Sequence, residues 1–443
     1  MKKLFIEDAV DKVGKEVELY GWVHNKRDHK KIIFLDLRDR TGIIQIVGDN
    51  KLKDFMPEDV VYIKGIVKKR PEKLVNPKLK TGTVEIEAKE AKLITKAENP
   101  PIDLTKEDLN VNLPTLLDYR SLTLRHPKIS SIFEVQENVV EGFRQAAKEQ
   151  GCVEIFVPQI AASATEGGAE VFKVNYYDHE VSLTQSPQLY KQMLVPIFER
   201  VFTIAHAYRA EPSVTTRHLS ETIQLDCEFG FVDFEDLLGL LEKVGTEMIK
   251  YAEKKSSTVL KKLGNTSISY GKIPRLTLEA AQEIIHKEFK RDVRGEDDLS
   301  PEDEVDICKW ALKNHKSDFV TITHFPTQKR AFYSMPDPKK PELSLSYDLL
   351  FRGLEIASGS QRVHEYGKLV ETIKKRGLKP EEFEMYLMAF KFGMPNEGGF
   401  SFGLERVTKA ILGLANIREA SLFPRDMQRV DMRLSAIEQK SKK

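Results

Sequence analysis

Five short runs of alternating β-branched and aromatic residues, all before residue 95, constrain the fold of this chain more than any other feature. The runs are EVELYGWVH, KIIFLDLRD, TGIIQIV, DVVYIKGIV and TVEIEAKEAKLI, and Gly, Asp, Asn and Pro residues separate them. An alternation with period two is typical of strands that bury one face. Five such strands within about 80 residues predict a small closed β-barrel.

The rest of the chain has a different pattern, in which long amphipathic helices are mixed with strands. In KISSIFEVQENVVEGFRQAAKEQ, apolar side chains recur at helical spacing at Ile132, Val135, Val139 and Phe143. We therefore expect an α+β protein with a barrel the size of an OB-fold. The predicted parts are the barrel domain over residues 1–105, a hinge or linker over 106–125, a mixed α/β domain over 126–432 and a disordered tail over 433–443.

Composition excludes several classes of protein. No run of about 18 apolar residues could cross a membrane, and the start MKKLFIEDAV becomes acidic before a signal peptide could form. We expect a cytoplasmic protein with no membrane partner. The net charge is +1, but residues 1–100 hold 22 Lys and Arg against 17 Asp and Glu. That excess fits either a phosphate-bearing partner or an ordinary solvated surface.

The cysteines do not form a recognisable site. Cys152, Cys227 and Cys308 lie far apart and lack the paired spacing of a zinc site. Their odd number argues against a disulfide framework. We expect reduced thiols, mostly in the core.

A nucleotide, if bound, must be held by side chains, because the chain has neither a P-loop motif nor a strand-linked G-x-G-x-x-G. RVFTIAHAYRAEPSVTTRHLSETIQLDCEF predicts two strands joined by a turn. Arg209 and Glu211 share one strand face, so a cation and an acceptor point into the same space. The turn carries Arg217 and His218. Taken alone, this could equally be a surface hairpin with an ion pair.

A second stretch, GGFSFGLERVTKAILGLANIREASLFPR, is rich in glycine and then becomes helical near Gly403. It carries Arg406 in the first turn of that helix. A cation beside free backbone N–H groups can bind an anion or stack on a base. Alone, the stretch could be an ordinary helix start.

Together, the two stretches resemble the second and third motifs of the class II aminoacyl-tRNA synthetases, and GCVEIFVPQI with Pro158 resembles the first, dimer-forming motif. The resemblance spans nearly the whole chain and is greatest to aspartyl-tRNA synthetases of archaeal and eukaryotic type. It implies an OB-fold anticodon-binding barrel and a catalytic domain with an antiparallel sheet flanked by helices. It also implies a homodimer with Pro158 at the interface.

The resemblance implies roles for individual residues in binding ATP. Arg209 and Arg406 are the expected catalytic residues: Arg209 holds the α-phosphate and the aspartate carboxylate, and Arg406 stacks on adenine and neutralises the γ-phosphate. Glu355 and Ser358 are the expected Mg²⁺ ligands, since hard oxygen donors suit that ion. The remaining expected ATP contacts are Glu211 at adenine, Arg217 and His218 at the outer phosphates, and Leu219, Gly403, Leu404 and Glu405.

One departure from the family pattern lies next to the adenine site. Many relatives have a phenylalanine after the glutamate of H-x-x-E-F, whereas HLSETIQLD has Thr222 and Ile223 there. We expect a weaker contact with the base rather than an inactive site.

The amino-acid pocket implied by the resemblance takes L-aspartate. Glu166, Ser186 and Gln188 would fix its α-amino end, whereas Lys191 and Arg362 would meet its side-chain carboxylate. Arg209, at the α-carboxylate, and Ser358 are further expected contacts with aspartate. An arginine fork and a second cation suit a carboxylate. Asparagine would leave Lys191 facing an amide N–H₂, donor against donor, an unmatched buried contact that can cost about 10⁴-fold in selectivity.

Three alternatives remain open at this point. An asparaginyl-tRNA synthetase has the same architecture and the arginine, but its relatives usually lack the lysine of QSPQLYK. A synthetase-like paralogue that makes asparagine generally lacks the barrel. A tRNA-binding protein with an inactive catalytic domain would not need the complete set of polar residues.

The barrel is expected to bind the anticodon of tRNA(Asp). Phe34 lies where family members stack a base, unless it belongs to the barrel core, and Arg27 and Gln45 are nearby polar candidates. His24 follows GWV where strictly tRNA(Asp)-specific relatives often have tryptophan. The chain is therefore a candidate for charging tRNA(Asn) with aspartate as well.

Overall fold

The structure is a computed structural model that describes residues 4–162, 170–212, 215–265 and 267–435. The chain divides into two compact units, residues 1–127 and 128–443. In the described part of the chain, no helix is long and apolar enough to cross a membrane. The predicted tail residues 436–443 lie outside the described residues.

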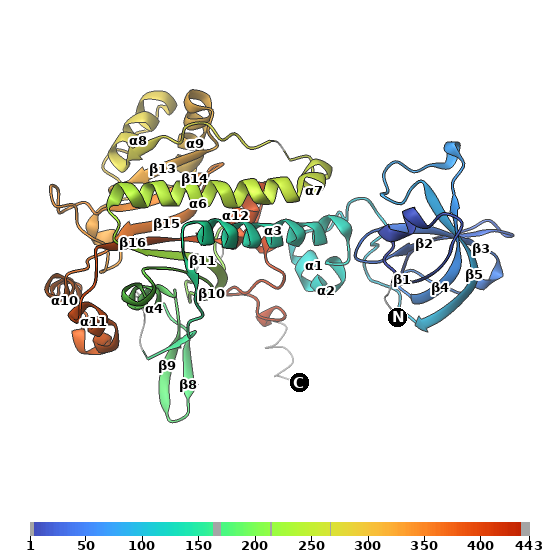
Figure 1. Cartoon of the computed structure of the whole chain (residues 1–443), viewed down its shortest axis with the longest axis horizontal. Helices are drawn as coiled ribbons and strands as arrows, with labels where there is room; N and C mark the ends of the chain where they lie inside the picture. Colours follow the sequence, from blue (N-terminus) through green and yellow to red (C-terminus); the bar gives the residue numbers. More distant parts are fainter. Residues whose placement is uncertain (1–3, 163–169, 213–214, 266, 436–443) are drawn as a thin grey trace. The chain divides into compact units, whose positions relative to one another are not determined.

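The first unit contains the predicted five-stranded barrel, so this part of the fold prediction is confirmed (Figure 1). The strands close in the order β1-β2-β3-β5-β4, and all neighbours are antiparallel except β3 and β5. Apolar side chains that alternate along the strands, such as Leu19, Leu35 and Ile63, fill the interior. The strands are β1 (Glu16–Asp28), β2 (Ile33–Arg38), β3 (Ile43–Gly48), β4 (Val60–Lys69) and β5 (Val84–Thr95), and the short helices α1 (Leu113–Asp118) and α2 (Arg120–Thr123) follow.

The second unit is built on an eight-stranded sheet in the order β12-β13-β14-β15-β16-β11-β10-β6. The six central strands are antiparallel, as expected, but both edge pairs, β12 with β13 and β6 with β10, are parallel, so the sheet is mixed. The strands are β6 (Val153–Glu154), β10 (Arg200–Tyr208), β11 (Glu221–Gly230), β12 (Arg275–Thr277), β13 (Phe319–Thr323), β14 (Ser346–Phe351), β15 (Leu354–Gln361) and β16 (Glu397–Gly403).

Two long helices, α3 (Pro127–Glu149) and α6 (Phe234–Lys255), run side by side across one face of this sheet (Figure 1). They cross closely at Gly142, where a Cβ would meet the carbonyl oxygen of Met248 at 2.7 Å. Their apolar faces pack with the aromatic side chains of the sheet, including Phe202 and Phe402, into the main core. This covers one face of the sheet. On the other face, α8 (Leu278–Ile284) and α9 (Pro301–His315) pack against β13 and β14, and the site lies over β11, β15 and β16.

The remaining elements surround this sheet. A small sheet, β7 (Ile160–Ala161), β9 (His179–Leu183) and β8 (Lys173–Tyr176), projects beside α4 (Gln188–Met193) (Figure 1). All three cysteines are buried free thiols, as expected. The other helices are α5 (Val195–Phe198), α7 (Ser257–Lys262), α8 (Leu278–Ile284), α9 (Pro301–His315), α10 (Tyr366–Lys375), α11 (Glu384–Lys391) and α12 (Leu404–Leu412).

Candidate active site

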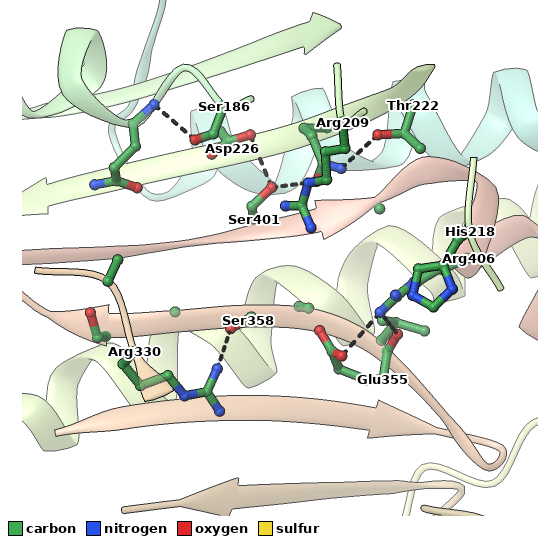
Figure 2. A pocket seen from close by; sticks show the side chains of 18 of the residues that line it. Ser186, Arg209, His218, Thr222, Asp226, Arg330, Glu355, Ser358, Ser401 and Arg406 are labelled. Carbon is green, nitrogen blue, oxygen red and sulfur yellow. Dashed lines mark hydrogen bonds and ion pairs between the residues drawn. The ribbon is translucent and has the colours of Figure 1, made fainter. Parts of the chain in front are cut away.

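A polar pocket of about 410 Å³ lies over the sheet of the second unit and is lined mainly from α4, β11, β15, β16 and the β10–β11 turn (Figure 2). The structure brings most of the sequence-predicted residues together here. Glu166 lies outside the described residues. Leu404 is buried in the core, so only its backbone could reach a nucleotide. The predicted residues that line the pocket are Ser186, Gln188, Lys191, Arg209, Glu211, Arg217, His218, Leu219, Glu355, Ser358, Arg362, Gly403, Glu405 and Arg406.

The predicted strand–turn–strand exists as the antiparallel pair β10–β11, in register from Arg200–Phe229 to Tyr208–Glu221. Just beyond β10, an Nη atom of Arg209 lies 3.7 Å from a carboxylate oxygen of Glu211. The side chain of Arg209 is 44% exposed, so its guanidinium is open to an incoming anion. Arg217 instead donates to Glu304 of α9 at 2.9 Å.

The glycine-rich stretch forms β16, which continues into α12 with Gly403 as the N-cap residue. Arg406 donates to the Glu355 carboxylate on β15 at 3.0 Å (Figure 2). The Glu405 carboxylate accepts the backbone N–H of Ile223 at 3.2 Å, and burial raises its pKa to about 7. The helix start therefore places a cation over the pocket.

A buried cluster of four charged residues forms the inner end of the pocket. Lys191 donates to Asp226 at 2.8 Å and lies 3.1 Å from a Glu228 oxygen. Arg362 donates to the other Glu228 oxygen at 2.8 Å and to Gln188 at 3.1 Å. All four charged side chains are at most 4% exposed. The two predicted aspartate-binding cations are thus held by two acidic residues of the protein itself.

The electrostatics of this cluster follow from burial and pairing. Burial raises the pKa of Asp226, despite the opposing effect of Lys191. Burial would likewise raise the pKa of Glu228, but Arg362 and Lys191 outweigh it and the net shift is downward. Burial alone would lower the pKa of Lys191, but Asp226 and Glu228 outweigh burial and raise it. Lys191 and Glu228 are therefore charged at neutral pH.

Sequence reasoning missed Asp226 and Glu228, although a signal was present. The two acids lie two residues apart in β11 and alternate with the apolar residues Leu225, Cys227 and Phe229, so they share one sheet face. A buried acidic pair needs cations. Also missed were Glu304, Arg330 and Asp348, which the fold alone brings to the pocket or its border.

The predicted metal ligands Glu355 and Ser358 lie on β15, and Asp348 is paired directly with Ser358 on the neighbouring strand β14. In the described part of the chain, no group of three or more His, Cys, Asp or Glu side chains is placed to hold a metal ion. However, the Oδ1 atom of Asp348 is buried without a hydrogen-bond partner among the described residues. Mg²⁺ commonly uses one or two carboxylates together with substrate phosphates, and these oxygens fit that pattern.

On the barrel, three of the predicted RNA-binding residues lie together and the fourth lies apart. Arg27 donates to Gln45 at 3.2 Å, and its guanidinium carbon lies 5.9 Å from the centre of the Phe34 ring. Phe34 is only partly buried and does not belong to the barrel core. His24 instead lies 3.3 Å from an Nη atom of Arg38, and burial together with that cation lowers its pKa to about 4.

Comparison with known proteins matches this geometry to a family. Residues 112–427 match the family described as tRNA synthetases class II (D, K and N), and residues 17–94 match the OB-fold nucleic acid binding domain. The chain belongs to the class II tRNA synthetases. It is therefore an aminoacyl-tRNA synthetase, and this class of enzyme uses ATP as a substrate.

Similar synthetases match nearly the whole chain. An aspartate–tRNA(Asp/Asn) ligase from Thermus thermophilus is 41% identical over 97% of this chain and 99% of its own length. An aspartate–tRNA(Asp) ligase from Pyrococcus abyssi is 38% identical over 94% and 96%. An asparaginyl-tRNA synthetase from Pyrococcus horikoshii, solved with asparaginyl-adenylate, aligns with a TM-score of 0.88 at 30% identity, over 97% and 99%.

Proposed function

We propose that this synthetase activates L-aspartate with ATP and transfers the aspartyl group to the 3′ end of tRNA(Asp) and of tRNA(Asn). The observation that carries the choice of amino acid is the buried pair of cations, Lys191 and Arg362, at the inner end of the pocket. Two cations favour a carboxylate over an amide, because an amide N–H₂ would point a donor at Lys191. The similar aspartate–tRNA ligases support the same assignment.

Residues along the pocket suit the two ends of the substrates. Ser186 and Gln188 border the cation pair, where we assign the α-amino end of aspartate, with Glu166 as a further contact. Arg209 lies at the turn, within reach of both a carboxylate and an α-phosphate. Toward the other end of the pocket we assign ATP, with its base and phosphates contacted by Glu211, Arg217, His218, Leu219, Gly403, Glu405 and Arg406. Leu404 would contribute only its backbone.

Mg²⁺ is assigned to Glu355 and Ser358, and we add Asp348 because of its unpaired buried oxygen. When bound, the ion neutralises charge on the ATP phosphates. The carboxylate of Glu355 is suited to this role, because Arg406 and Arg330 outweigh the effect of burial and lower its pKa. It is therefore ionised at neutral pH.

The reaction has two steps that depend mainly on positioning and on neutralising charge. First, the α-carboxylate of aspartate attacks the α-phosphorus of ATP, the bond to the β-phosphate breaks and pyrophosphate leaves. Arg209 and Arg406 stabilise the negative charge that builds on the phosphates. Second, a terminal ribose hydroxyl of tRNA attacks the aspartyl carbonyl, AMP leaves, and the hydroxyl proton passes to a phosphate oxygen.

The anticodon is assigned to the face of the barrel that carries Arg27, Phe34 and Gln45. The Phe34 ring is available for stacking, since it lies outside the core, and Arg27 and Gln45 are already oriented beside it. We assign the choice between tRNA(Asp) and tRNA(Asn) to the region of His24, a smaller side chain than tryptophan and uncharged at neutral pH.

We further propose a cytoplasmic homodimer. Pro158 is exposed, and Phe156, two residues before it, is 87% exposed, so this segment presents apolar surface. A second copy of the chain would cover this surface.

We propose the same division of the chain as the sequence predicts: residues 1–105 form the anticodon-binding domain, 106–125 the hinge and 126–432 the catalytic domain.

The decisive experiment measures ATP–pyrophosphate exchange with aspartate and with asparagine. We expect exchange with aspartate only. Arg209→Ala should abolish it, because the α-phosphate and the carboxylate would both lose their cation. Normal exchange in that variant, or exchange driven by asparagine, would overturn the proposal.

A separate experiment tests the choice of tRNA. Purified tRNA(Asp) and tRNA(Asn) are charged with aspartate at identical salt, because salt alone changes RNA affinity strongly. We expect comparable charging of both. A strong preference for tRNA(Asp) would remove tRNA(Asn) from the proposed function and leave the first step intact.

A further inference from the structure

Arg330 occupies the place where the proposed metal ligands converge. It follows the short 3₁₀ helix η5 (Thr327–Lys329) and reaches two adjacent strands of the sheet. One Nη atom donates to an Asp348 carboxylate oxygen at 2.7 Å and the other to the hydroxyl oxygen of Ser358 at 3.1 Å, the contact drawn in Figure 2. A guanidinium thus binds two of the three oxygen donors assigned to the ion.

This position is fixed by packing and by the backbone. The guanidinium carbon lies 3.8 Å from the centre of the Phe325 ring. The carbonyl oxygen of Arg330 accepts a hydrogen bond from Arg376 at 2.7 Å, and Arg376 also binds the carbonyl oxygen of Gln328 at 2.7 Å. The Arg330 side chain is only 18% exposed. Its contact with Asp348 is therefore preorganised.

Asp348 would be costly to leave without a counter-charge. Its side chain is 9% exposed, and burial raises its pKa to about 6, with Arg330 opposing that shift. Its second oxygen, Oδ1, remains unpaired among the described residues. Arg330 supplies the charge that an ion would otherwise supply, while one oxygen remains for an ion.

The same arrangement occurs at the other acids around the pocket. Arg406 lies 3.0 Å from Glu355, and Arg217 lies 2.9 Å from Glu304. Each of these acids is neutralised by an arginine without any ligand. A divalent cation that entered alone would sit beside several guanidinium groups, whereas one that entered with ATP would bring phosphates for those groups to bind.

We propose that Arg330 is a resident counter-cation of the metal site, which holds Asp348 and Ser358 until ATP brings its metal ion and then gives up Asp348. Arg330 is a positioning residue in this account. The proposal rests on the assignment of the metal ligands in the proposed function. It requires that the metal ion binds weakly without nucleotide and that Arg330 is the cause.

The test titrates the full-length protein with Mn²⁺ alone, without nucleotide. Binding is monitored by the loss of the EPR signal of the free ion. We expect Arg330→Met to bind Mn²⁺ at least about ten-fold more tightly than the unaltered chain, because a like charge at contact distance is removed. Arg330→Gln, which keeps a donor for Ser358, should show the same direction of change.

Arg352→Met is the matched control. Arg352 forms a similarly buried ion pair with Asp318 at 3.2 Å, with side chains 17% and 10% exposed, and it does not line the pocket. It should leave Mn²⁺ affinity unchanged. Adding Asp348→Asn to Arg330→Met should remove the gain.

Two outcomes would overturn the proposal: folded Arg330 variants that bind Mn²⁺ no more tightly than the unaltered chain, or a gain that persists without the Asp348 carboxylate. Both outcomes are measurements of Mn²⁺ affinity and are independent of catalysis. If the unaltered chain showed no aspartate-dependent pyrophosphate exchange, that result would instead contradict the proposed function, so the two failures are distinguishable.

Discussion

The anticodon face of the barrel and the inner end of the catalytic pocket both use charged side chains, but they hold them differently. On the barrel, Arg27 is 48% exposed and its partner Asp36 is 18% exposed. In the pocket, Lys191 and Asp226 are each 1% exposed. A partly exposed pair contributes about 0–1 kcal/mol and can rearrange around an RNA. A buried pair is costly to break and fixes geometry, which suits the selection of a small substrate.

The largest expected effect comes from breaking the buried pair. Lys191→Met should abolish exchange with aspartate, and it should lower the free energy of unfolding of the second unit by about 3–5 kcal/mol, because Asp226 and Glu228 would lose a buried counter-charge. Pyrophosphate exchange and urea unfolding measure the two effects.

Adding Asp226→Asn to Lys191→Met separates these effects. The double variant should recover most of the lost stability, because one unpaired carboxylate is gone, but it should not recover activity. Recovery of aspartate-dependent exchange would show that Lys191 is only a structural partner of Asp226.

The two units that contain these regions should also differ in how the free energy of unfolding depends on pH. Burial raises the pKa of Glu405 in the folded protein from 4.5 to about 7, so ionising it opposes folding. Stability is therefore lost as pH rises from about 4.5 to 7 and stays lower above that range. As the pH is raised from 5 to 8, the free energy of unfolding of Glu405→Gln should increase by about 2.5 kcal/mol relative to that of the unaltered chain.

The two tryptophans allow this to be measured for each unit. Trp22 lies in the first unit and Trp310 in the second, so replacing either with Phe leaves a fluorescence reporter on the other. The pH-dependent gain should appear at Trp310 and not at Trp22. An equal gain at both would contradict the contrast between the regions.

The smallest expected effect is on the barrel. Phe34→Ala should weaken tRNA binding about ten-fold, since stacking on one base contributes about 1–3 kcal/mol, and should leave pyrophosphate exchange unchanged. Tyr62→Ala is the control, because Tyr62 packs against Tyr20 on β1, whereas Phe34 pairs with Arg27 further along that strand. Filter binding at fixed salt measures both. Equal losses would place the anticodon elsewhere on the barrel.

Much of the fold could be predicted because its signals are local. The alternation of apolar residues along KIIFLDLRD and TGIIQIV predicts β2 and β3 to within a few residues, and the helical spacing from Ile132 to Phe143 predicts α3. The parallel edge pairs of the large sheet could not be predicted, because β6 and β12 have only two and three residues and their partners are distant in sequence.

The candidate site was predictable where a residue belongs to a recognisable motif, as Arg209, Glu355 and Arg406 do. The partners of these residues were not predictable in the same way. Arg330 is 18 residues from Asp348, and Lys191 is 35 residues from Asp226; only the folded sheet brings each pair into contact. Charge balance inside a pocket is a property of the fold and not of a motif.

The burial of the cysteines determines which side chains should be oxidised first. Burial raises the pKa of the Cys308 thiol to about 12 and that of Cys227 well above its usual value, so both remain protonated and poorly nucleophilic. Oxidants should therefore first reach exposed thioethers such as Met385 and Met388, which are 63% and 52% exposed on α11 and do not line the pocket. Mild oxidation should add oxygen to this surface long before it affects catalysis.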